Sequence, residues 1–337
     1  MQRVLIVGCG RIAGGFDEHR DPTLFALTHA GAYSKRDDVK VVACVDPNLE
    51  LVKAFAQRWN IPAMYSSLAE IPPTEQFDII SVCVPTAFHE ETICQVLEFS
   101  PRALFIEKPI SMSAANSTEL MSRCKDKGIS VLVNYSRRWD MQVNTFFDEL
   151  RSGKYGELRS VVAIYNKGIR NNGSHIIDLL LNLFGTLQPI WSEVRLGSSA
   201  HETTAHETTA HETVLDPDIN AILRGPNQES IHLVCTDSTD FSQFELQILT
   251  SDAELRMLDG GARWSVRKKQ ASPEFSGYSR LGEEEYVSGG YLPVMEAAIK
   301  QLTSDVHANV LSYGSAESAV QVEELCEQLI RQAYEKH

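Results

Sequence analysis

Three features are scarce in this sequence of 337 residues: long apolar runs, paired cysteines and positive charge. No apolar run approaches the ~20 residues that a membrane-spanning helix needs. The seven cysteines are odd in number and form no CxxC pair, which favours reduced, buried thiols over a disulfide framework. The N-terminus lacks the apolar core and the cleavage pattern of a signal peptide. We therefore expect a cytoplasmic protein without a membrane partner.

The deficit of positive charge narrows the choice of partner. Lys and Arg number 31 against 45 Asp and Glu, so the formal net charge is −14. Such a surface repels the phosphates of nucleic acids and of anionic membranes. Nucleic acid is therefore not an expected partner. Any anionic ligand must be met by local positive charge or by backbone N–H groups.

The first third of the chain alternates short apolar runs with helical patterns. The apolar runs lie at 4–7, 39–45, 77–84, 103–106 and 129–133. The helical patterns between them lie at 49–59, 90–99 and 114–127. Continuous apolar strands separated by helices are typical of parallel strands that are covered on both faces. We predict an α/β domain over residues 1–133, a doubly wound parallel sheet of the Rossmann type.

After about residue 134 the pattern changes. Strand-like segments with polar alternation follow one another at 158–167, 190–196, 219–224, 230–236, 244–249, 254–258 and 263–268. Helical patterns lie at 139–150, 174–184, 292–304 and 315–335. Successive alternating strands joined by short turns favour an antiparallel sheet with one exposed face. We predict that residues 134–337 form a second, α+β domain with an open, mainly antiparallel sheet.

One segment, residues 200–213, repeats the unit His-Glu-Thr-Thr-Ala. A step of five residues turns about 140° on a helix and alternates faces on a strand. Neither arrangement places His201, His206 and His211 on one side, and the spacing differs from the helical HExxH zinc motif. We therefore expect a solvated loop between two strands and no metal site.

The segment that follows the first apolar run reads G-x-G-x-x-A. In this motif the first glycine permits a tight turn, the second lets a pyrophosphate approach the backbone, and the alanine is small enough for close helix–strand packing. The N-terminus of a following helix then presents N–H groups to the phosphates. We predict a dinucleotide site with contacts from Gly8, Gly10, Arg11, Ile12 and Ala13.

Asp46 ends the second apolar run. A carboxylate at this place can accept hydrogen bonds from ribose hydroxyls and repels a 2′-phosphate. The interval from Gly10 to Asp46 exceeds the usual ~20 residues, and the extra length lies in 14–33. An ordinary turn carboxylate before Pro47 is the alternative. We favour the ribose role, and hence NAD over NADP.

Further residues extend this pattern into a family resemblance. Pro85 and His89 follow one buried strand, Glu107-Lys108-Pro109 follow the next, and a helix opens with Gly-Ser-His-Ile-Ile-Asp at 173–178. Together with the G-x-G-x-x-A loop and with 134–139, they resemble the Gfo/Idh/MocA family of NAD(P)-dependent oxidoreductases. The resemblance covers most of the chain. It implies a sugar-like small-molecule substrate and a homodimer or homotetramer that pairs the open sheets of two subunits.

The resemblance also implies a role for each matched residue. Lys108 follows a parallel strand at the edge where ligands of open α/β sheets bind, and its ammonium can hydrogen-bond the reacting oxygen. His175 can exchange a proton near neutral pH. Lys108 and His175 are therefore the candidate catalytic residues. Further cofactor contacts are expected from Pro85, His89 and Glu107, and substrate contacts from Asn134, Tyr165, Lys167 and Asn171.

Three of the substrate candidates carry an argument of their own. Tyr165 and Lys167 are two residues apart, so on a strand they share one face and line a common pocket. Asn171 stands where many family members carry an aspartate. An amide can hydrogen-bond a hydroxyl but cannot accept its proton. The proton relay must then run through Lys108 and His175, or through another residue.

Three functions remain open at this point. The leading one is an oxidoreductase that moves a hydride between nicotinamide and a CH–OH or keto carbon of a sugar, nucleotide sugar or cyclitol. A glycoside hydrolase that uses NAD without consuming it would need the same loop and lysine, and net NADH formation separates the two. The third is a dinucleotide-sensing regulator without catalysis, against which intact Lys108 and His175 argue.

The repeat supplies a first test. Deleting two of its three five-residue units should leave the fold and kcat close to native, because its polar residues bury little apolar surface and a shorter loop changes closure entropy only slightly. Circular dichroism and turnover measurements check this expectation. Stoichiometric zinc in the tag-free protein that disappears with the deletion would contradict it.

Overall fold

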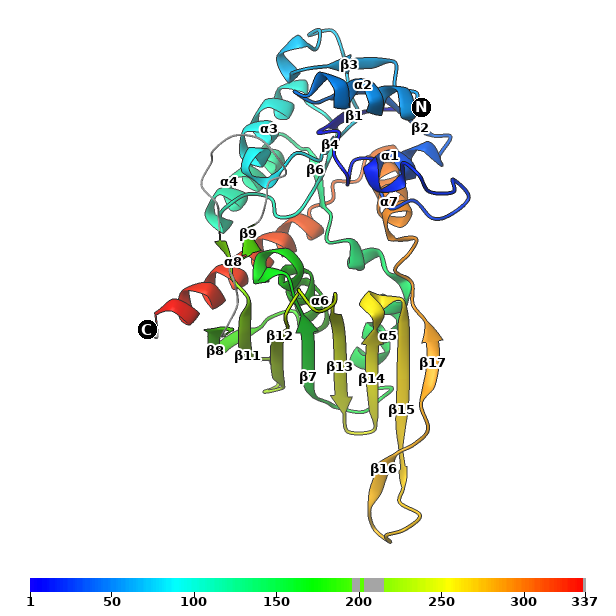
Figure 1. The fold of residues 1–337 in the computed structure, drawn as a ribbon, viewed down its shortest axis with the longest axis vertical. Helices are drawn as coiled ribbons and strands as arrows, with labels where there is room; N and C mark the ends of the chain where they lie inside the picture. The colour runs from blue at the N-terminus through cyan, green and yellow to red at the C-terminus, as the bar shows by residue number, and fades with distance from the viewer. Residues whose placement is uncertain (196–200, 203–214, 336–337) are drawn as a thin grey trace. The chain divides into compact units, whose positions relative to one another are not determined.

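The computed structural model describes residues 1–195, 201–202 and 215–335 (Figure 1). The described chain forms two compact units. The first holds 1–139 and 292–321, and the second holds the other described residues. Within the described ranges, no helix is both long enough and apolar enough to cross a membrane. All seven cysteines are free thiols, and six of them are buried.

The first unit is built on a six-stranded parallel sheet with the order β3-β2-β1-β4-β5-β6. Its strands are β1 Gln2–Val7, β2 Val39–Val45, β3 Ala63–Tyr65, β4 Ile79–Val82, β5 Ala103–Ile106 and β6 Ser130–Val133. The strand order reverses between β1 and β4, which makes this edge the topological switch point. The predicted Rossmann sheet is confirmed, with β3 as a strand that the sequence pattern did not reveal.

Helices cover both faces of this sheet. They are α1 His29–Ser34, α2 Leu49–Arg58, α3 His89–Val96, α4 Ala114–Asp126 and α7 Val294–Ala308. Ile299, Leu302 and Val306 of α7 belong to the same buried cluster as Val4 and Ile6 of β1. Because α7 packs into this core, residues 292–321 belong to the first unit. The sequence analysis, by contrast, divided the chain once, between residues 133 and 134.

The first helix is interrupted by an inserted segment. After Ala13 the chain makes a short 3-10 turn, η1 Gly15–Asp17, and α1 begins only at His29. The amides of His29 and Ala30 donate to the carbonyl oxygens of Ile12 and Ala13, at 3.2 and 2.8 Å. Helix α1 therefore continues the turn that follows the phosphate loop, which we define as residues 8–13. Residues 14–28 form an insertion between the two. Asp17 holds the two ends of this insertion together, because its carboxylate accepts a hydrogen bond from the Thr28 hydroxyl at 2.6 Å.

The second unit contains the larger sheet, with the order β16-β15-β14-β13-β7-β12-β11-β8 and with β17 beside β15. These strands are β7 Leu158–Tyr165, β8 Gln188–Val194, β11 Ile219–Arg224, β12 Ser230–Cys235, β13 Phe244–Thr250, β14 Ala253–Leu258, β15 Arg263–Ala271, β16 Ser279–Leu281 and β17 Glu285–Ser288. Every pairing is antiparallel except that of β7 with β12. The open, mainly antiparallel sheet is thus confirmed.

One face of this sheet is covered by helices α5 Met141–Arg151 and α6 Ser174–Phe184 and by the end of α8 Gly314–Tyr334 (Figure 1). The alternation along β7 shows the two faces, because Val161 and Ala163 are buried while Val162 and Ile164 are half-buried. A two-residue strand pair, β9 His201–Glu202 with β10 Leu215–Asp216, flanks residues 203–214. Those residues hold most of the repeat and lie outside the described residues, so the loop prediction stays a prediction.

Two glycines of the phosphate loop give a matched test of the fold. Gly8 has φ +89°, and a Cβ there would lie 2.7 Å from the backbone of Cys83 and Val84, whereas a Cβ on Gly10 would meet no described atom within 4 Å. We predict that Gly8→Ala lowers the free energy of unfolding by about 2 kcal/mol or more, because strain and overpacking combine. Gly10→Ala should change it by less than about 0.5 kcal/mol. Urea unfolding measures both, and equal midpoints for the two variants would contradict this account.

Candidate functional site

The phosphate loop, Gly8–Ala13, follows β1 at the switch point of the first sheet. The side of Gly10 that a Cβ would occupy is open, so a ligand can approach the backbone there. The loop closes through bonds from the Gly14 amide to the Gly10 carbonyl and from the Phe16 amide to the Arg11 carbonyl, at 3.2 and 2.9 Å. Residues 14–28 separate this turn from α1, and they lie within the interval 14–33 to which the sequence assigned the extra length.

Asp46 connects this loop to the end of β2. Its Oδ2 accepts the Cys9 amide and its Oδ1 accepts the Asn48 amide, both at 2.9 Å. The side chain is half-buried, and each carboxylate oxygen has a second lone pair for another donor. Asp46 therefore lies beside the phosphate loop, where its predicted ribose role requires it. Arg11 is exposed and Ile12 is half-buried on the same loop.

Glu107 and Lys108 follow β5, at the carboxyl edge of the same sheet. Oε1 of Glu107 accepts a hydrogen bond from Nδ2 of Asn134 at 2.6 Å and lies 2.9 Å from Nε2 of His29. Burial alone would raise the pKa of Glu107, but His29, Asn134 and the charge of Lys108 outweigh it and lower that pKa. Glu107 is therefore an ionised carboxylate beside Lys108.

His29 is a functional candidate that the sequence analysis missed. Its ring is buried, packs against Phe105 with the ring centroids 4.5 Å apart, and carries the proton on Nε2 because an ionised carboxylate only accepts. Residues 14–28 separate it from the phosphate loop in sequence, which hid the connection. The available signal was the Thr28-His29 pair, a helix N-cap followed by a titratable side chain.

Two predicted contacts of the first unit are buried side chains with partners inside the protein. Asn134, expected to touch substrate, is buried and uses its amide to hold Glu107. His89, expected to touch the cofactor, is also buried, and its Nδ1 and Nε2 lie 2.7 and 2.9 Å from the carbonyl oxygens of Pro109 and Val84. His89 thus joins the loops that follow β4 and β5, and burial lowers its pKa. Pro85 is exposed beside it.

In the second unit, β7 leads into a π-helical turn, η6 Gly168–Gly173, and then into α6. Lys167 precedes the turn with φ 67° and is exposed. Asn171 lies within the turn and His175 in the first turn of α6, and both are half-buried. The amide of Asn171 donates to Oδ2 of Asp216 at 2.9 Å. The predicted substrate residues Lys167 and Asn171 and the predicted catalytic residue His175 therefore lie on one short stretch of chain.

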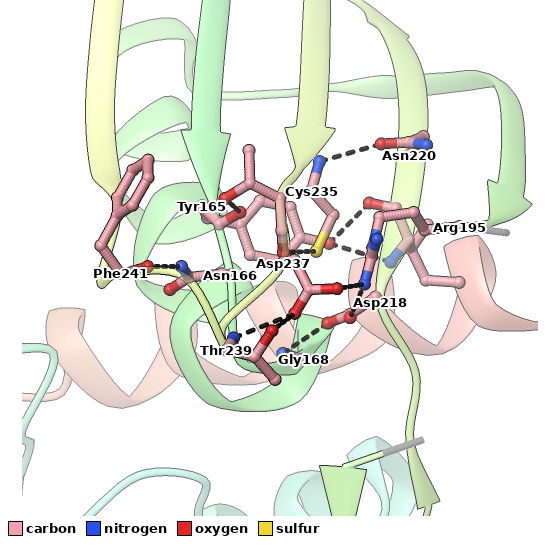
Figure 2. Close-up of polar contacts among 12 residues, drawn as sticks. Tyr165, Asn166, Gly168, Arg195, Asp218, Asn220, Cys235, Asp237, Thr239 and Phe241 are labelled. Carbon is pink, nitrogen blue, oxygen red and sulfur yellow. Dashed lines mark hydrogen bonds and ion pairs between the residues drawn. The ribbon is translucent and has the colours of Figure 1, made fainter. Parts of the chain in front are cut away.

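Tyr165 does not belong with them (Figure 2). Its side chain is fully buried, its hydroxyl donates to the Ile219 carbonyl at 2.6 Å, and burial raises its pKa well above the ordinary value. Strand β7 ends at Tyr165, and Lys167 adopts a left-handed conformation, so the two side chains do not share a strand face. Tyr165 therefore packs in the core of the second unit, apart from the exposed Lys167.

The described residues contain no group of three or more His, Cys, Asp or Glu side chains placed to hold a metal ion. The features that do converge are an open glycine loop, a carboxylate at the end of β2 and an ionised Glu107 beside Lys108. In a doubly wound sheet, that edge is where dinucleotides bind. These features define a Rossmann domain of the dinucleotide-binding class.

Comparison with known proteins agrees with this class. Residues 2–135 match the Gfo/Idh/MocA family model, which is described as an oxidoreductase family with an NAD-binding Rossmann fold. Over these residues, which form most of the first unit, the chain is similar to this family of NAD-binding oxidoreductases.

Individual relatives are distant. D-apiose dehydrogenase of Paraburkholderia graminis is 21% identical over 197 residues, which cover 53% of this chain and 49% of that protein. The chain thus spans about half the length of the curated relatives it matches.

The likeness to solved structures covers the chain more fully. The 3-ketoreductase KijD10 of Actinomadura kijaniata, in complex with NADP and TDP-benzene, is 16% identical with a TM-score of 0.75, over 98% of this chain and 97% of that one. An Agrobacterium radiobacter oxidoreductase, in complex with NAD+, L-tartaric acid and magnesium, is 14% identical with a TM-score of 0.73, over 100% and 97%. At these identities the likeness shows a shared fold.

Proposed function

We propose that this protein is an NAD-dependent dehydrogenase or reductase that acts on a CH–OH or keto carbon of a sugar, nucleotide sugar or cyclitol. The observation that carries the proposal is the ionised, largely buried Glu107 beside Lys108, at the same sheet edge as the open phosphate loop. The substrate class draws support from relatives named as a sugar dehydrogenase and a 3-ketoreductase.

The first unit supplies the cofactor contacts in this proposal. Gly8–Ala13 would hold the pyrophosphate, because the open side of Gly10 admits a phosphate to the backbone. Asp46 would accept hydrogen bonds from the adenosine ribose, and Pro85 would line the adjoining edge. Bound NAD supplies the hydride acceptor in oxidation and, once reduced, the hydride donor in reduction.

Lys108 moves the proton at the reacting oxygen. In reduction its ammonium donates the proton that neutralises the developing alkoxide, and in oxidation the neutral amine takes that proton back. Glu107 keeps a compensating negative charge beside this lysine. Glu107 itself is fixed by His29 and Asn134, so Lys108 follows a loop of defined conformation.

The second unit supplies the substrate contacts. His175 is the second proton-transfer group, because imidazole exchanges a proton near neutral pH. Asn171 hydrogen-bonds a substrate hydroxyl, and the exposed Lys167 adds positive charge. We also propose a homodimer or homotetramer, because the strand face opposite the helices exposes Ile190 by 42% and Val234 by 39%.

Cofactor choice tests the role of Asp46. The native protein should bind NAD more tightly than NADP, because the carboxylate repels a 2′-phosphate. Asp46→Ser should narrow the ratio of the two dissociation constants by roughly tenfold, about 1.4 kcal/mol of discrimination. Asp46→Asn is the matched control for shape, since it keeps the size of the side chain while it removes the charge and turns one acceptor oxygen into an NH₂ donor. Quenching of protein fluorescence measures the six dissociation constants, and equal affinity of the native protein for both dinucleotides would exclude the role.

Catalysis tests Lys108 and His175, once a thermal-shift screen of nucleotide sugars and polyols with NAD present has identified a substrate. Lys108→Ala should lower kcat by roughly 10²-fold or more while NAD affinity stays unchanged, because the lost interaction is made with the reacting oxygen. His175→Ala should lower kcat by a similar factor.

The control is Lys127→Ala, which removes an exposed lysine that pairs only loosely with Glu98 at 3.8 Å. Its kcat should equal the native value. Near-native turnover of Lys108→Ala would exclude the proposed chemistry. A loss of thermal stability without loss of kcat in His175→Ala would give that histidine a structural role.

A further inference from the structure

One short segment accepts hydrogen bonds from four consecutive backbone amides at the start of the helical stretch that carries His175. The segment is Asp216-Pro217-Asp218, which we call the aspartate clamp. The Gly168 amide donates to Oδ1 of Asp218 at 3.0 Å, and the Ile169 amide donates to the Pro217 carbonyl at 3.0 Å (Figure 2 shows the first of these).

The next two amides both bind one carboxylate. The Arg170 amide donates to Oδ1 of Asp216 at 2.8 Å, and the Asn171 amide donates to Oδ2 of the same residue at 2.9 Å. The first four amides of a helix have no partner within the helix. Here the aspartate clamp satisfies the whole set, although it lies more than forty positions further along the chain.

The clamp is buried, and its charge is compensated. Asp216 and Asp218 are both 0% exposed, and a buried carboxylate is stable only when donors or opposite charge surround it. The helix N-terminus supplies aligned amide dipoles. The guanidinium of Arg195 lies 3.4 Å from Oδ2 of Asp218, and the backbone amide of Arg195 donates a hydrogen bond to the Asp218 carbonyl at 2.9 Å (Figure 2).

The helical turn is shaped to this carboxylate. Gly168 has φ +80°, and a Cβ on it would lie 2.1 Å from Oδ2 of Asp216, so a larger residue could not occupy that position without displacing the clamp. The conformation of 168–171 is therefore set by a remote segment as well as by its own sequence. Because η6 runs directly into α6, the same contacts fix the first turn of α6, which carries His175.

We propose that Asp216 and Asp218 are positioning residues for the reaction. They hold the stretch 168–175 in the one arrangement that presents Asn171 and His175 to substrate. The inference rests on the proposed function in one respect, namely that His175 acts on the substrate. The clamp itself, and its effect on the four amides, can be measured without any turnover.

The first measurement is hydrogen exchange by mass spectrometry on the ligand-free full chain. Asp216→Asn leaves one carbonyl oxygen for two amides, and its own NH₂ group faces the other. The amides of 170 and 171 should then exchange at least tenfold faster than in the native protein. Asp218→Asn should do the same for the amide of 168, and it provides a second variant if Asp216→Asn does not fold.

The matched control is Asp237→Asn. Asp237 lies 3.1 Å from Arg195 and accepts the Thr239 amide and hydroxyl, and these partners lower its pKa to about 2. The variant therefore removes one carboxylate charge from the same network without removing an acceptor of the four amides. Exchange at 168–171 and kcat should both stay at native values.

The second measurement is a double-mutant cycle in kcat. Asp216→Asn should lower kcat by roughly tenfold or more with NAD affinity unchanged. In the Asp216→Asn background, the fold-decrease in kcat caused by His175→Ala should be several times smaller than in the native chain, because the histidine is already misplaced. A merely stabilising aspartate would leave the penalty of His175→Ala undiminished, and that outcome overturns the proposal.

Unchanged exchange at 168–171 in both clamp variants would also overturn it. The proposed function fails separately. If His175→Ala alone leaves kcat at the native value, His175 has no role in turnover, and so the clamp positions no catalytic group. The exchange result then shows whether the clamp exists as a purely structural device.

Discussion

The arrangement of the first unit depends on one largely buried carboxylate, that of Glu107, whose side chain is 13% exposed. A buried negative charge is stable only with donors around it, and the two nearest are supplied by residues that lie far apart in the chain. His29 comes from α1, and Asn134 follows β6. The hydrogen bonds of this single carboxylate therefore hold the start of α1, the end of β5 and the end of β6 close to one another, at the edge of the sheet where the phosphate loop lies.

The second unit uses the same physical device on backbone rather than on side chains. There the donors are four amides at a helix N-terminus, and the acceptors are two buried aspartates and the carbonyl between them. In each unit, a carboxylate that could not remain buried alone fixes a segment bearing a proposed catalytic group. Lys108 follows Glu107 directly, and His175 follows the clamped turn by four residues. Buried charge in this protein is therefore used to define conformation.

The inserted residues 14–28 show how the structure of a phosphate loop can be kept while the usual spacing of its sequence is lost. The turn after the phosphate loop stops at η1, yet the amides of His29 and Ala30 donate to the carbonyls of Ile12 and Ala13. Asp17 fixes the return by accepting the Thr28 hydroxyl, and Gly31 leaves room for that carboxylate, because a Cβ there would lie 2.4 Å from Oδ2 of Asp17. The helix is thus reassembled from two pieces.

The sequence by itself determined the class of fold and the chemistry at the sheet edge. Apolar runs that end in Gly8, Asp46 and Glu107 mark parallel strands, and the residues just past such strands meet at one edge because all strands run the same way. Alternation in the later strands likewise determined a one-sided antiparallel sheet.

Only the tertiary structure decided which polar side chains are buried among partners within the protein and which stay accessible. Asn134, His89 and Tyr165 have the right residue types, but their partners are buried groups distant in sequence, and no local pattern encodes those contacts. His29 and Asp216 gained their roles in the same way. Burial and hydrogen bonding are properties of the assembled chain, so they separate a ligand contact from its scaffold only after folding.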